Sequence, residues 1–467
     1  MVLRTLLASL MLFVAVGIVH SKDVDIIPYP QSVELTQVVF DKSKLGKVKY
    51  RKDKKMAPEA YELQIKKNGI VIKSATPAGR YYAEQTLAQL ADDDVMYCGT
   101  IKDEPRYAWR GLMLDESRHF FGKELVLKFL DLMGRYKLNR FHWHLSDDQG
   151  WRIEIKAYPN LTKVGGVGCH TNGNAPARYY TQEEIKEIVA YAAERNIMII
   201  PEIDMPGHAS AFVKVFPEFS GKHRTVNPAN EKLYEVLAII YKELADLFPG
   251  YYLHIGGDEV NKGGWNDLPG MKELMARENL QTMNEVEEYF GRRLSDIITS
   301  TGKNVVAWDD LVDSGTSPQG KVMMWWRCEQ PQLLQDGADK GFDMIVCPDG
   351  PFYLDYVQDI RDKVGQLVER QWVNEMREIY EYDMLDNPKV VGVQSNIWTE
   401  QVITTKRLEY MVFPRIIALA EKAWTRNERL NYDNFLDRLT NEYKYLDTRN
   451  IYYYDFRENY HREEPRK

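Results

Sequence analysis

The sequence predicts an α/β fold, a (β/α)8 TIM barrel preceded by a small α+β domain. Two observations predict it. Eight short apolar runs recur between residues 104 and 449, most of them followed by a stretch with helical spacing, and each run leads into polar or aromatic residues. Near-continuous apolar runs are typical of parallel strands that are covered on both faces. In such barrels the reacting groups come from the carboxyl ends of the strands, where these polar clusters fall.

Length and composition limit the classes of protein. The chain has 467 residues, of which 44% are hydrophobic, enough for a large core and more than one domain. A net charge of -8 argues against binding to a nucleic-acid backbone. The glycine-rich dinucleotide motif and the phosphate-binding loop are both missing, which disfavours a doubly wound nucleotide-binding fold.

The N-terminus resembles an export signal. Arg4 precedes an apolar run from Leu6 to Val19, which is shorter than the roughly 18 residues of a membrane span. We therefore interpret residues 1–21 as a signal peptide and expect no membrane span. Export implies a periplasmic or extracellular location, or a lysosomal or secretory one in a eukaryote.

Four cysteines follow: Cys98, Cys169, Cys328 and Cys347. Their spacing matches neither a zinc knuckle nor a redox pair. An exported protein permits disulfides. We nonetheless expect free, buried thiols, because a core of this size needs no covalent cross-links.

Residues 22–103 are predicted to form the small α+β domain. Residues 61–65 and 69–73 alternate apolar and polar side chains, as half-buried strands do, and residues 76–90 have apolar side chains at helical spacing. This part of the chain contains no catalytic constellation. The run Asp103-Glu104-Pro105 marks the predicted boundary with the barrel.

The barrel domain is predicted to span residues 104–449. Its strands are expected at residues 111–114, 140–145, 197–200, 252–255, 305–307, 322–324, 344–347 and 390–393. Helices are expected at residues 123–136, 181–194, 232–247, 285–300 and 407–422. Residues 450–467 are aromatic and then charged, and we expect this tail to pack in part.

Residues 251–260 carry the clearest chemical signal. A short apolar strand ends in Gly256, Gly257, Asp258 and Glu259. Glycine lets the backbone turn sharply or approach a ligand closely. Crowded carboxylates cannot both ionise freely, so the more buried one is pushed toward the neutral acid. The alternative is a helix cap, in which one carboxylate neutralises the first turn of the next helix.

Three motifs together resemble a known family. They are FHWHLSDDQGWR at residues 141–152, PEIDMPGH at residues 201–208 and HIGGDE at residues 254–259. In this order they resemble the β-N-acetylhexosaminidases of glycoside hydrolase family twenty, over roughly residues 61 to 421. The resemblance implies an exo-acting enzyme that removes terminal β-linked N-acetylglucosamine or N-acetylgalactosamine with retention. It implies no metal and no cofactor.

The resemblance also implies catalytic roles. The family uses the acetamide of the substrate as nucleophile, which gives an oxazoline intermediate, instead of a second carboxylate. Glu259 would protonate the leaving oxygen and later deprotonate water. Asp258 would accept the acetamide N–H, and Tyr353 would hold the acetamide oxygen. Asp204, His208 and His254 would support the carboxylate pair.

Sugar-binding residues are implied in the same way. Arg118 would bind the 3- and 4-hydroxyls, Asp355 the outer hydroxyls, and Glu400 the 4- and 6-hydroxyls. The guanidinium group of arginine suits paired sugar oxygens. Tryptophan rings would form the walls of the pocket, namely Trp308, Trp325, Trp372 and Trp398, with Trp398 as the floor and Trp326 as a competing candidate for the place of Trp325.

Two other classes stay open. His142 and His144 are two apart on a strand and face the same way, and His208, His254 and Asp309 could complete a metal-dependent hydrolase site. A glycan-binding protein on an inactive barrel is the second alternative. The expected partner is an oligosaccharide or glycoconjugate with a terminal N-acetylhexosamine, not nucleic acid, and a homodimer is left open. The loop of residues 165–178 departs from the family pattern, so aglycone preference is open.

Overall fold

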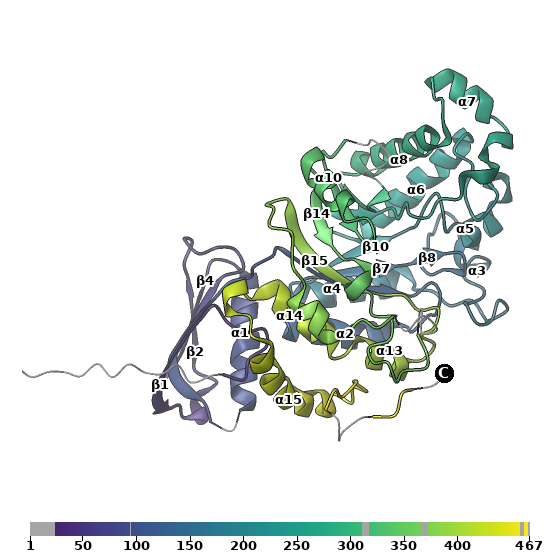
Figure 1. The fold of residues 1–467 in the computed structure, drawn as a ribbon. Helices are drawn as coiled ribbons and strands as arrows, with labels where there is room; N and C mark the ends of the chain where they lie inside the picture. Colours follow the sequence, from purple (N-terminus) through teal and green to yellow (C-terminus); the bar gives the residue numbers. More distant parts are fainter. Residues whose placement is uncertain (1–23, 94, 311–316, 366–371, 458–461, 466–467) are drawn as a thin grey trace, which may run out of the picture.

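The computed structural model describes residues 24–93, 95–310, 317–365, 372–457 and 462–465. The predicted signal peptide lies outside the described residues, as does part of the predicted tail. No helix in the described part of the chain is long and apolar enough to cross a membrane. A small sheet domain lies beside a larger barrel (Figure 1). The predicted fold is confirmed.

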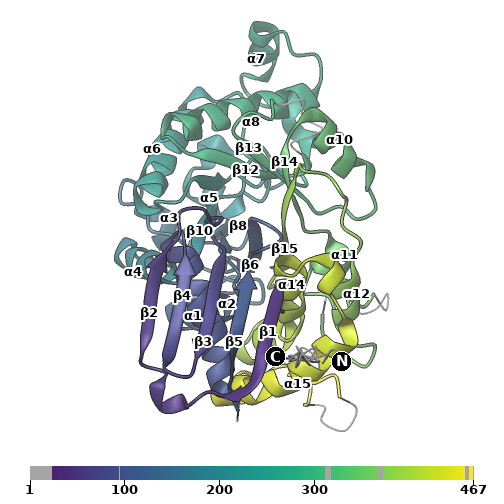
Figure 2. The same ribbon diagram turned by 90° about the vertical axis from the view of Figure 1, so that its left-hand side faces the viewer.

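The small domain is a five-stranded sheet with one helix. The sheet has the order β1-β5-β3-β4-β2, and only β2 and β4 pair in parallel. Its strands are β1 (Ser32–Val39), β2 (Val48–Lys52), β3 (Tyr61–Lys66), β4 (Gly69–Ser74) and β5 (Tyr97–Asp103). Helix α1 (Pro77–Asp92) begins after Thr76, whose side chain accepts a hydrogen bond from Gly79 N–H. It covers one face of the sheet, and Figure 2 shows the other face open.

Eight parallel strands close into the barrel in chain order, because β15 pairs with β6. They are β6 (Trp109–Asp115), β7 (Arg140–His144), β10 (Met198–Glu202), β11 (Tyr252–His254), β12 (Asn304–Trp308), β13 (Lys321–Trp325), β14 (Asp343–Val346) and β15 (Val390–Ile397). A two-stranded hairpin, β8 (Ser146–Asp147) and β9 (Gly150–Trp151), follows β7. Each barrel strand overlaps one of the eight predicted runs.

Helices surround the barrel (Figures 1 and 2). They are α2 (Lys123–Arg135), α3 (Asn160–Lys163), α4 (Gln182–Glu194), α5 (Ser210–Val215), α6 (Glu231–Leu247), α7 (Met271–Glu278), α8 (Met283–Ser300), α10 (Gln332–Lys340), α11 (Asp349–Phe352), α12 (Met376–Glu381), α13 (Thr405–Val412), α14 (Arg415–Trp424) and α15 (Tyr432–Thr448). Short 3-10 turns are η1 (Lys42–Lys44), η2 (Pro217–Phe219), η3 (Lys262–Asp267) and η5 (Asn427–Arg429).

One predicted helix was wrong. Residues 407–422 were expected as a single helix, but the structure divides the region into α13 and α14. Pro414 lies between them, and proline has no N–H to donate and its ring clashes with the preceding turn. The segment therefore turns at Pro414 although its apolar spacing continues.

The barrel strands present two apolar faces. Outward side chains pack against the helices, whereas the interior contains a separate apolar cluster that includes Trp109, Ile200, Val306, Trp308 and Met324. Alternate residues on a strand point to opposite faces. The side chains at the strand ends are therefore divided between the interior and the helix layer.

The small domain packs against the amino ends of β6 and β7 through buried polar contacts. Asp103 accepts hydrogen bonds from Lys137 Nζ at 2.9 Å and from Trp424 Nε1 at 2.9 Å. Arg110 donates to Glu59 at 3.0 Å. The junction thus lies at the end of the barrel opposite to the carboxyl ends of the strands.

All four cysteines are unpaired in the structure, as expected. Cys98 and Cys347 are buried, whereas Cys169 and Cys328 are half-buried.

Candidate active site

The turn after β11 positions the carboxylate pair. Gly256 and Gly257 have φ values of 69° and 99°, in the region that favours glycine, and Glu259 has a φ of 50°. A Cβ atom on Gly256 would lie 1.8 Å from Asp204 Oδ1. The turn leaves the Asp258 side chain 13% exposed and the Glu259 side chain 58% exposed. It therefore presents Asp258 inward and Glu259 outward.

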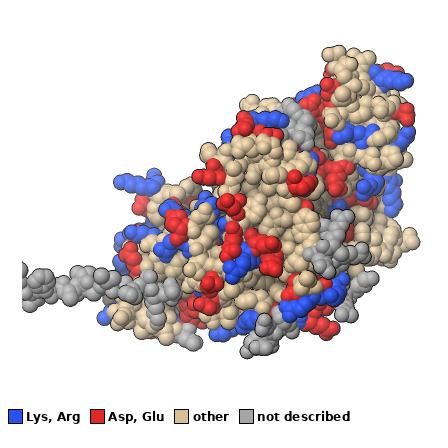
Figure 3. Space-filling view, in the orientation of Figure 1, with Lys and Arg blue, Asp and Glu red and all other residues tan. Residues whose placement is uncertain are grey.

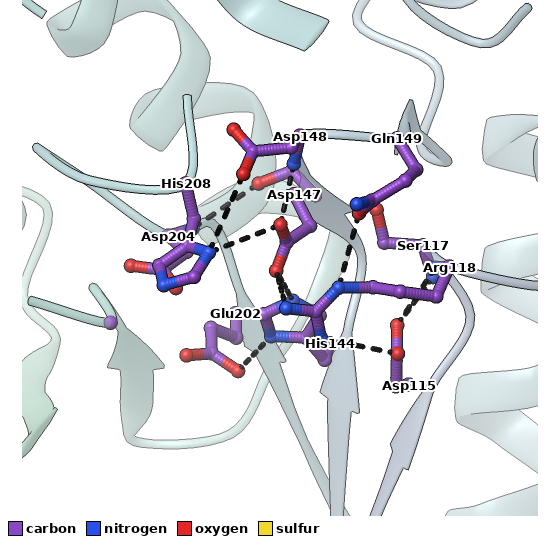
Figure 4. Close-up of polar contacts among 12 residues, drawn as sticks. Asp115, Ser117, Arg118, His144, Asp147, Asp148, Gln149, Glu202, Asp204 and His208 are labelled. Atoms are coloured by element: carbon purple, nitrogen blue, oxygen red, sulfur yellow. Dashed lines mark hydrogen bonds and ion pairs between the residues drawn. The ribbon is translucent and has the colours of Figure 1, made fainter. Parts of the chain in front are cut away.

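His208 joins the pair to a buried aspartate. Its Nε2 lies 3.4 Å from Glu259 Oε2 and 3.8 Å from Asp258 Oδ2, and its Nδ1 lies 3.2 Å from Asp147 Oδ1. Figure 4 shows the ring beside Asp147 and Asp148. Burial lowers the pKa of His208, but Asp147 and the hydrogen bond to Glu259 outweigh it and hold that pKa far above its ordinary value. His208 is therefore an imidazolium at neutral pH.

The two carboxylates have opposite pKa shifts. Burial raises the pKa of Asp258 to about 7, against the attraction of His208. The hydrogen bond from His208 lowers the pKa of Glu259. The expectation that the more buried carboxylate is pushed toward the neutral acid agrees with these shifts. The proposed proton donor, Glu259, is nonetheless the more acidic group in the free site because it is exposed and paired with a cation.

Asp204 lies behind the pair and is fully buried. Its Oδ1 accepts a hydrogen bond from Gly257 N–H at 3.1 Å. Burial and the neighbouring Asp258 raise its pKa well above the ordinary value. Asp204 therefore keeps a proton under conditions in which Asp258 can lose one.

Two acidic residues that the sequence reasoning did not assign organise the site. Glu202, at the end of β10, lies 2.9 Å from His142 Nε2, 2.6 Å from His144 Nδ1, 3.1 Å from His254 Nδ1 and 3.0 Å from Trp308 Nε1. It is the second residue of the PEIDMPGH motif, and its place at a strand end, two residues before Asp204, was the available signal.

Asp147 is the second of these residues. Its Oδ2 lies 2.7 Å from Arg118 Nη2 and 3.0 Å from His144 Nε2, and its Oδ1 contacts His208 (Figure 4). A continuous series of contacts thus runs from Trp308 through Glu202, His144, Asp147 and His208 to Glu259.

The predicted hydroxyl-binding residues surround a set of unused acceptors. Arg118 Nη2 lies 3.6 Å from Glu400 Oε1. Asp258 Oδ1, Asp355 Oδ1 and Glu400 Oε2 are buried and have no hydrogen-bond partner within the described ranges of the chain. Burial together with Glu400 raises the pKa of Asp355 well above its ordinary value. Buried polar atoms usually have partners, so these oxygens are suited to a polar ligand.

Aromatic side chains line the same region. The Trp398 ring lies 4.9 Å from the Arg118 guanidinium, 6.0 Å from Trp308 and 6.2 Å from Tyr353. Tyr353 is also near Asp258, which helps burial to raise its pKa well above the ordinary value. Its phenol therefore stays protonated and can donate a hydrogen bond.

The structure does not place Trp325 in the wall of the pocket, where it was expected. Trp325 packs with the outer cluster between strands and helices, and its Nε1 donates to the Gln330 carbonyl. Trp326 instead packs against the interior cluster, and its ring is stacked 6.4 Å from Tyr353. The reason is the alternation of side chains along a strand. Trp372 is 38% exposed and lies 5.7 Å from the Tyr356 ring, at the edge of the aromatic group.

Hydrogen bonds hold the loop of residues 165–178, which departs from the family pattern, beside Arg118. Buried Arg152 donates to the carbonyls of Gly166, Gly168 and Ser117 at 2.7, 2.8 and 2.7 Å. His170 N–H donates to the Arg118 carbonyl at 2.9 Å. The loop thus contacts the side of the site that the family resemblance assigns to the sugar hydroxyls.

Several groups of side chains have donor atoms near enough to hold a metal ion. They include His142, Glu202 and His254, and also Asp204, His208 and Asp258, with donor atoms within 4.8 Å of one another. The same atoms already contact one another, and the His208 imidazolium and the Arg118 guanidinium supply positive charge. These cations repel a divalent ion at the second group and at Asp147.

Both parts of the chain match families of known proteins. Residues 107–427 match the glycosyl hydrolase family 20 catalytic domain, and residues 35–104 match domain 2 of that family. A beta-hexosaminidase of Porphyromonas gingivalis is 35% identical over 430 residues, which cover 85% of this chain and 54% of that protein. One of Vibrio furnissii is 36% identical over 396 residues, covering 77% and 64%. The chain thus spans between half and two thirds of the length of these two relatives.

Other relatives match over most of both chains. A beta-hexosaminidase of Akkermansia muciniphila is 30% identical over 453 residues, covering 90% of each chain. The crystal structure of an exo beta-N-acetylglucosaminidase from Vibrio harveyi in complex with N-acetylglucosamine has a TM-score of 0.84 at 30% identity, covering 92% of this chain and 78% of that one. The beta-N-acetylhexosaminidase of Bacteroides fragilis has a TM-score of 0.83 at 26% identity, covering 92% and 96%. This chain belongs to glycosyl hydrolase family 20.

Proposed function

We propose that this chain is an exo-acting, retaining β-N-acetylhexosaminidase that removes terminal β-linked N-acetylglucosamine or N-acetylgalactosamine. The observation that carries the proposal is the arrangement of Asp258 and Tyr353. A buried, unpartnered carboxylate oxygen and a protonated phenol lie near one another at the carboxyl ends of the barrel strands. These two groups suit the N–H and the carbonyl of an acetamide.

The first step forms a bond within the substrate. The acetamide oxygen attacks the anomeric carbon, and the bond from that carbon to the leaving oxygen breaks. Asp258 accepts the acetamide N–H, and the Tyr353 hydroxyl donates to the acetamide oxygen. Positive charge develops on the ring of the oxazoline that forms. Asp258 stabilises this charge as an anion. The neighbouring Asp204 keeps its own proton and therefore does not repel the negative charge of Asp258.

Glu259 moves the proton in both steps. It gives a proton to the leaving oxygen, which takes the electron pair of the broken bond. It then takes a proton from water as that water attacks the anomeric carbon and the oxazoline opens. In the free site Glu259 is 58% exposed and its pKa is lowered by His208. An aglycone that covers this carboxylate raises its pKa by desolvation, which favours the acid form needed for the first step.

The remaining residues recognise the sugar. Arg118, Asp355 and Glu400 present polar groups toward the hydroxyls, and the free oxygens of Asp355 and Glu400 are available as acceptors. The rings of Trp308, Trp326 and Trp398 supply apolar surface for the sugar C–H faces. This division between polar and aromatic contacts is what a small-ligand site requires.

Matched variants of two tyrosines test the proposal. Tyr353 and Tyr356 lie on the same segment, and their rings are 6.3 Å apart. We expect Tyr353→Phe to lower kcat for 4-nitrophenyl β-N-acetylglucosaminide by roughly tenfold to a hundredfold, as for one lost hydrogen bond in a transition state. Tyr356→Phe should change kcat little. Equal effects, or a sugar trapped on a side chain, would refute the use of the acetamide.

The leaving group provides a second test. Glu259→Gln should slow hydrolysis of chitobiose far more than hydrolysis of the nitrophenyl glycoside, because a poor leaving group needs the acid. Activity should survive treatment with chelator. Activity that is lost in chelator and restored by zinc would instead support the metal-dependent hydrolase. A protein that binds but never cleaves a panel of glycans would support the binding-only alternative.

We also propose export of the protein with removal of residues 1–21. Sequencing the N-terminus of the mature protein tests this. A mature chain that keeps Met1 would contradict it.

A further inference from the structure

Positive charge is concentrated in one short segment of the small domain. Residues 42–55 contain eight Lys or Arg and one Asp, a net charge of +7, whereas the whole chain carries -8. The remainder of the chain therefore carries -15. Such asymmetry indicates a local electrostatic function, because charges farther apart than the Debye length of about 8 Å act independently at physiological salt.

This segment lies along one edge of the five-stranded sheet. It contains β2, the last strand in the order β1-β5-β3-β4-β2. The turn between β3 and β4 lies beside it, since Lys44 Nζ donates to the Lys67 carbonyl at 3.1 Å and Ile70 N–H donates to the Lys47 carbonyl at 3.1 Å. We define the basic edge as the exposed cations of both segments: Lys47, Lys49, Arg51, Lys52, Lys54, Lys55, Lys66 and Lys67.

No member of the basic edge forms an ion pair with an acidic side chain in the parts of the chain that the structure describes. The acids of this region are already engaged elsewhere. Glu62 pairs with Lys73 at 2.8 Å, and Glu59 pairs with Arg110 at 3.0 Å. In Figure 3, Lys and Arg side chains project from the upper left tip of the molecule, where the small domain lies. The positive charge of the edge is thus uncompensated.

Protection of the sheet edge does not account for all of this charge. Lysines on an edge strand prevent pairing with another chain, and those on β2 have this effect. Lys47, Lys54, Lys55 and Lys67 lie in turns outside β2, and Lys66 is the last residue of β3. There they cannot block strand pairing, but they lengthen the positively charged surface.

The basic edge faces away from the candidate active site. The small domain packs against the amino ends of β6 and β7, and the carboxylates lie at the carboxyl ends of the barrel strands. Figure 2 shows β2 at the outer margin of the sheet. A partner bound there would leave the active site open.

The composition of the edge selects the kind of partner. Seven of its eight cations are lysines, which act as hydrated point charges, whereas arginine is suited to paired hydrogen bonds with a sulfate or carboxylate. The Arg80 guanidinium lies 3.6 Å from the centre of the Tyr50 ring and covers one face of it, which leaves less stacking surface for a sugar. A row of lysines on an open edge suits a flat layer of anionic headgroups.

We propose that the basic edge docks this protein peripherally on anionic lipid bilayers. This inference does not rest on the proposed function. The test is cosedimentation of the protein with vesicles of phosphatidylcholine alone and of phosphatidylcholine with phosphatidylglycerol. We expect binding to the anionic vesicles at low salt, none to the neutral ones, and release at high salt.

A matched pair of charge reversals locates the surface. One variant carries Lys49→Glu, Arg51→Glu and Lys52→Glu. The control carries Lys186→Glu, Lys232→Glu and Lys272→Glu, which are exposed on barrel helices and change the net charge equally. The edge variant should bind anionic vesicles roughly a hundredfold more weakly, and the control should bind nearly as the unaltered protein does.

Three outcomes would overturn the proposal. They are no binding of the unaltered protein to anionic vesicles, equal loss in both variants, and retention on dextran sulfate without vesicle binding. The last outcome would assign the edge to a soluble polyanion. Unchanged thermal unfolding and hydrolysis in the edge variant would show that the fold and the proposed activity do not depend on this surface.

Discussion

A substitution at Gly256 tests whether catalysis depends on the position of Asp204 against the turn after β11. We consider Gly256→Ala. The added Cβ would lie 1.8 Å from Asp204 Oδ1, 2.2 Å from its Cγ and 2.8 Å from its Cα, whereas ordinary contact begins at 3.4 Å. A change of rotamer cannot relieve the contact with the backbone atom. Both Asp204 and the turn must therefore move.

The size of the movement sets the expected effect. The Asp204 carboxyl must retreat by roughly 1.6 Å, which also breaks its 3.1 Å hydrogen bond from Gly257 N–H. A misplacement of about 1 Å can lower a rate by roughly a hundredfold. We expect kcat to fall by at least about that factor. The free energy of unfolding should fall by roughly 2–5 kcal/mol, the sum of overpacking and of the left-handed backbone of alanine.

Gly257→Ala is the matched control. Its φ is 99°, so alanine is also strained there, but a Cβ at Gly257 would meet nothing within 4 Å. We expect a smaller loss of stability and a kcat within about tenfold of the unaltered protein. The assay is kcat and KM for 4-nitrophenyl β-N-acetylglucosaminide, with thermal unfolding of each variant. Equal losses of kcat in the two variants would refute the reasoning, because the backbone alone would then explain them.

Three further predictions concern buried carboxyls. Burial raises the pKa of Glu116 from 4.5 to about 7. The free energy of unfolding should therefore fall as the pH rises from about 4.5 to about 7. Glu116→Gln should remove this pH dependence, roughly 3 kcal/mol between pH 4 and pH 8 by denaturant unfolding, and an unchanged slope would contradict it. Asp258 acts as an anion in the proposed mechanism, so for kcat/KM we expect an acidic limb near pH 7, with activity rising as Asp258 loses its proton. Asp258→Asn should remove this limb from the pH profile of the residual activity, and a limb that stays would belong to another group. Glu202→Gln should lower kcat by roughly tenfold to a hundredfold with little change in KM. Equal loss in Glu116→Gln, a carboxyl buried to the same extent, would contradict a positioning role for Glu202.

The barrel strands and the helices α1, α2, α4, α6 and α8 could be predicted because their causes are local. A barrel strand is buried on both faces, so it reads as an apolar run. Helices α4 and α8 begin with capping boxes, Thr181 with Glu184 and Thr282 with Glu285, which are visible in the sequence. The division between α13 and α14 had its signal in Pro414.

The choice between Trp325 and Trp326 could not be read in this way. The run from Met323 to Trp326 is apolar at every position, because one side of β13 faces the helices and the other faces the barrel interior. Hydrophobicity therefore does not distinguish the two faces. Only the register of β13 with its neighbours decides which ring meets Tyr353.

The sequence by itself determined the barrel, the glycine turn and the adjacent carboxylates, because strand burial and turn chemistry act between residues near in the chain. The tertiary structure decided which carboxyl holds a proton. Asp258, Asp204 and His208 come from two different strand ends, and their pKa values depend on burial and on separations across the barrel. Charge interactions and desolvation depend on distance in space, and distance along the chain does not specify it.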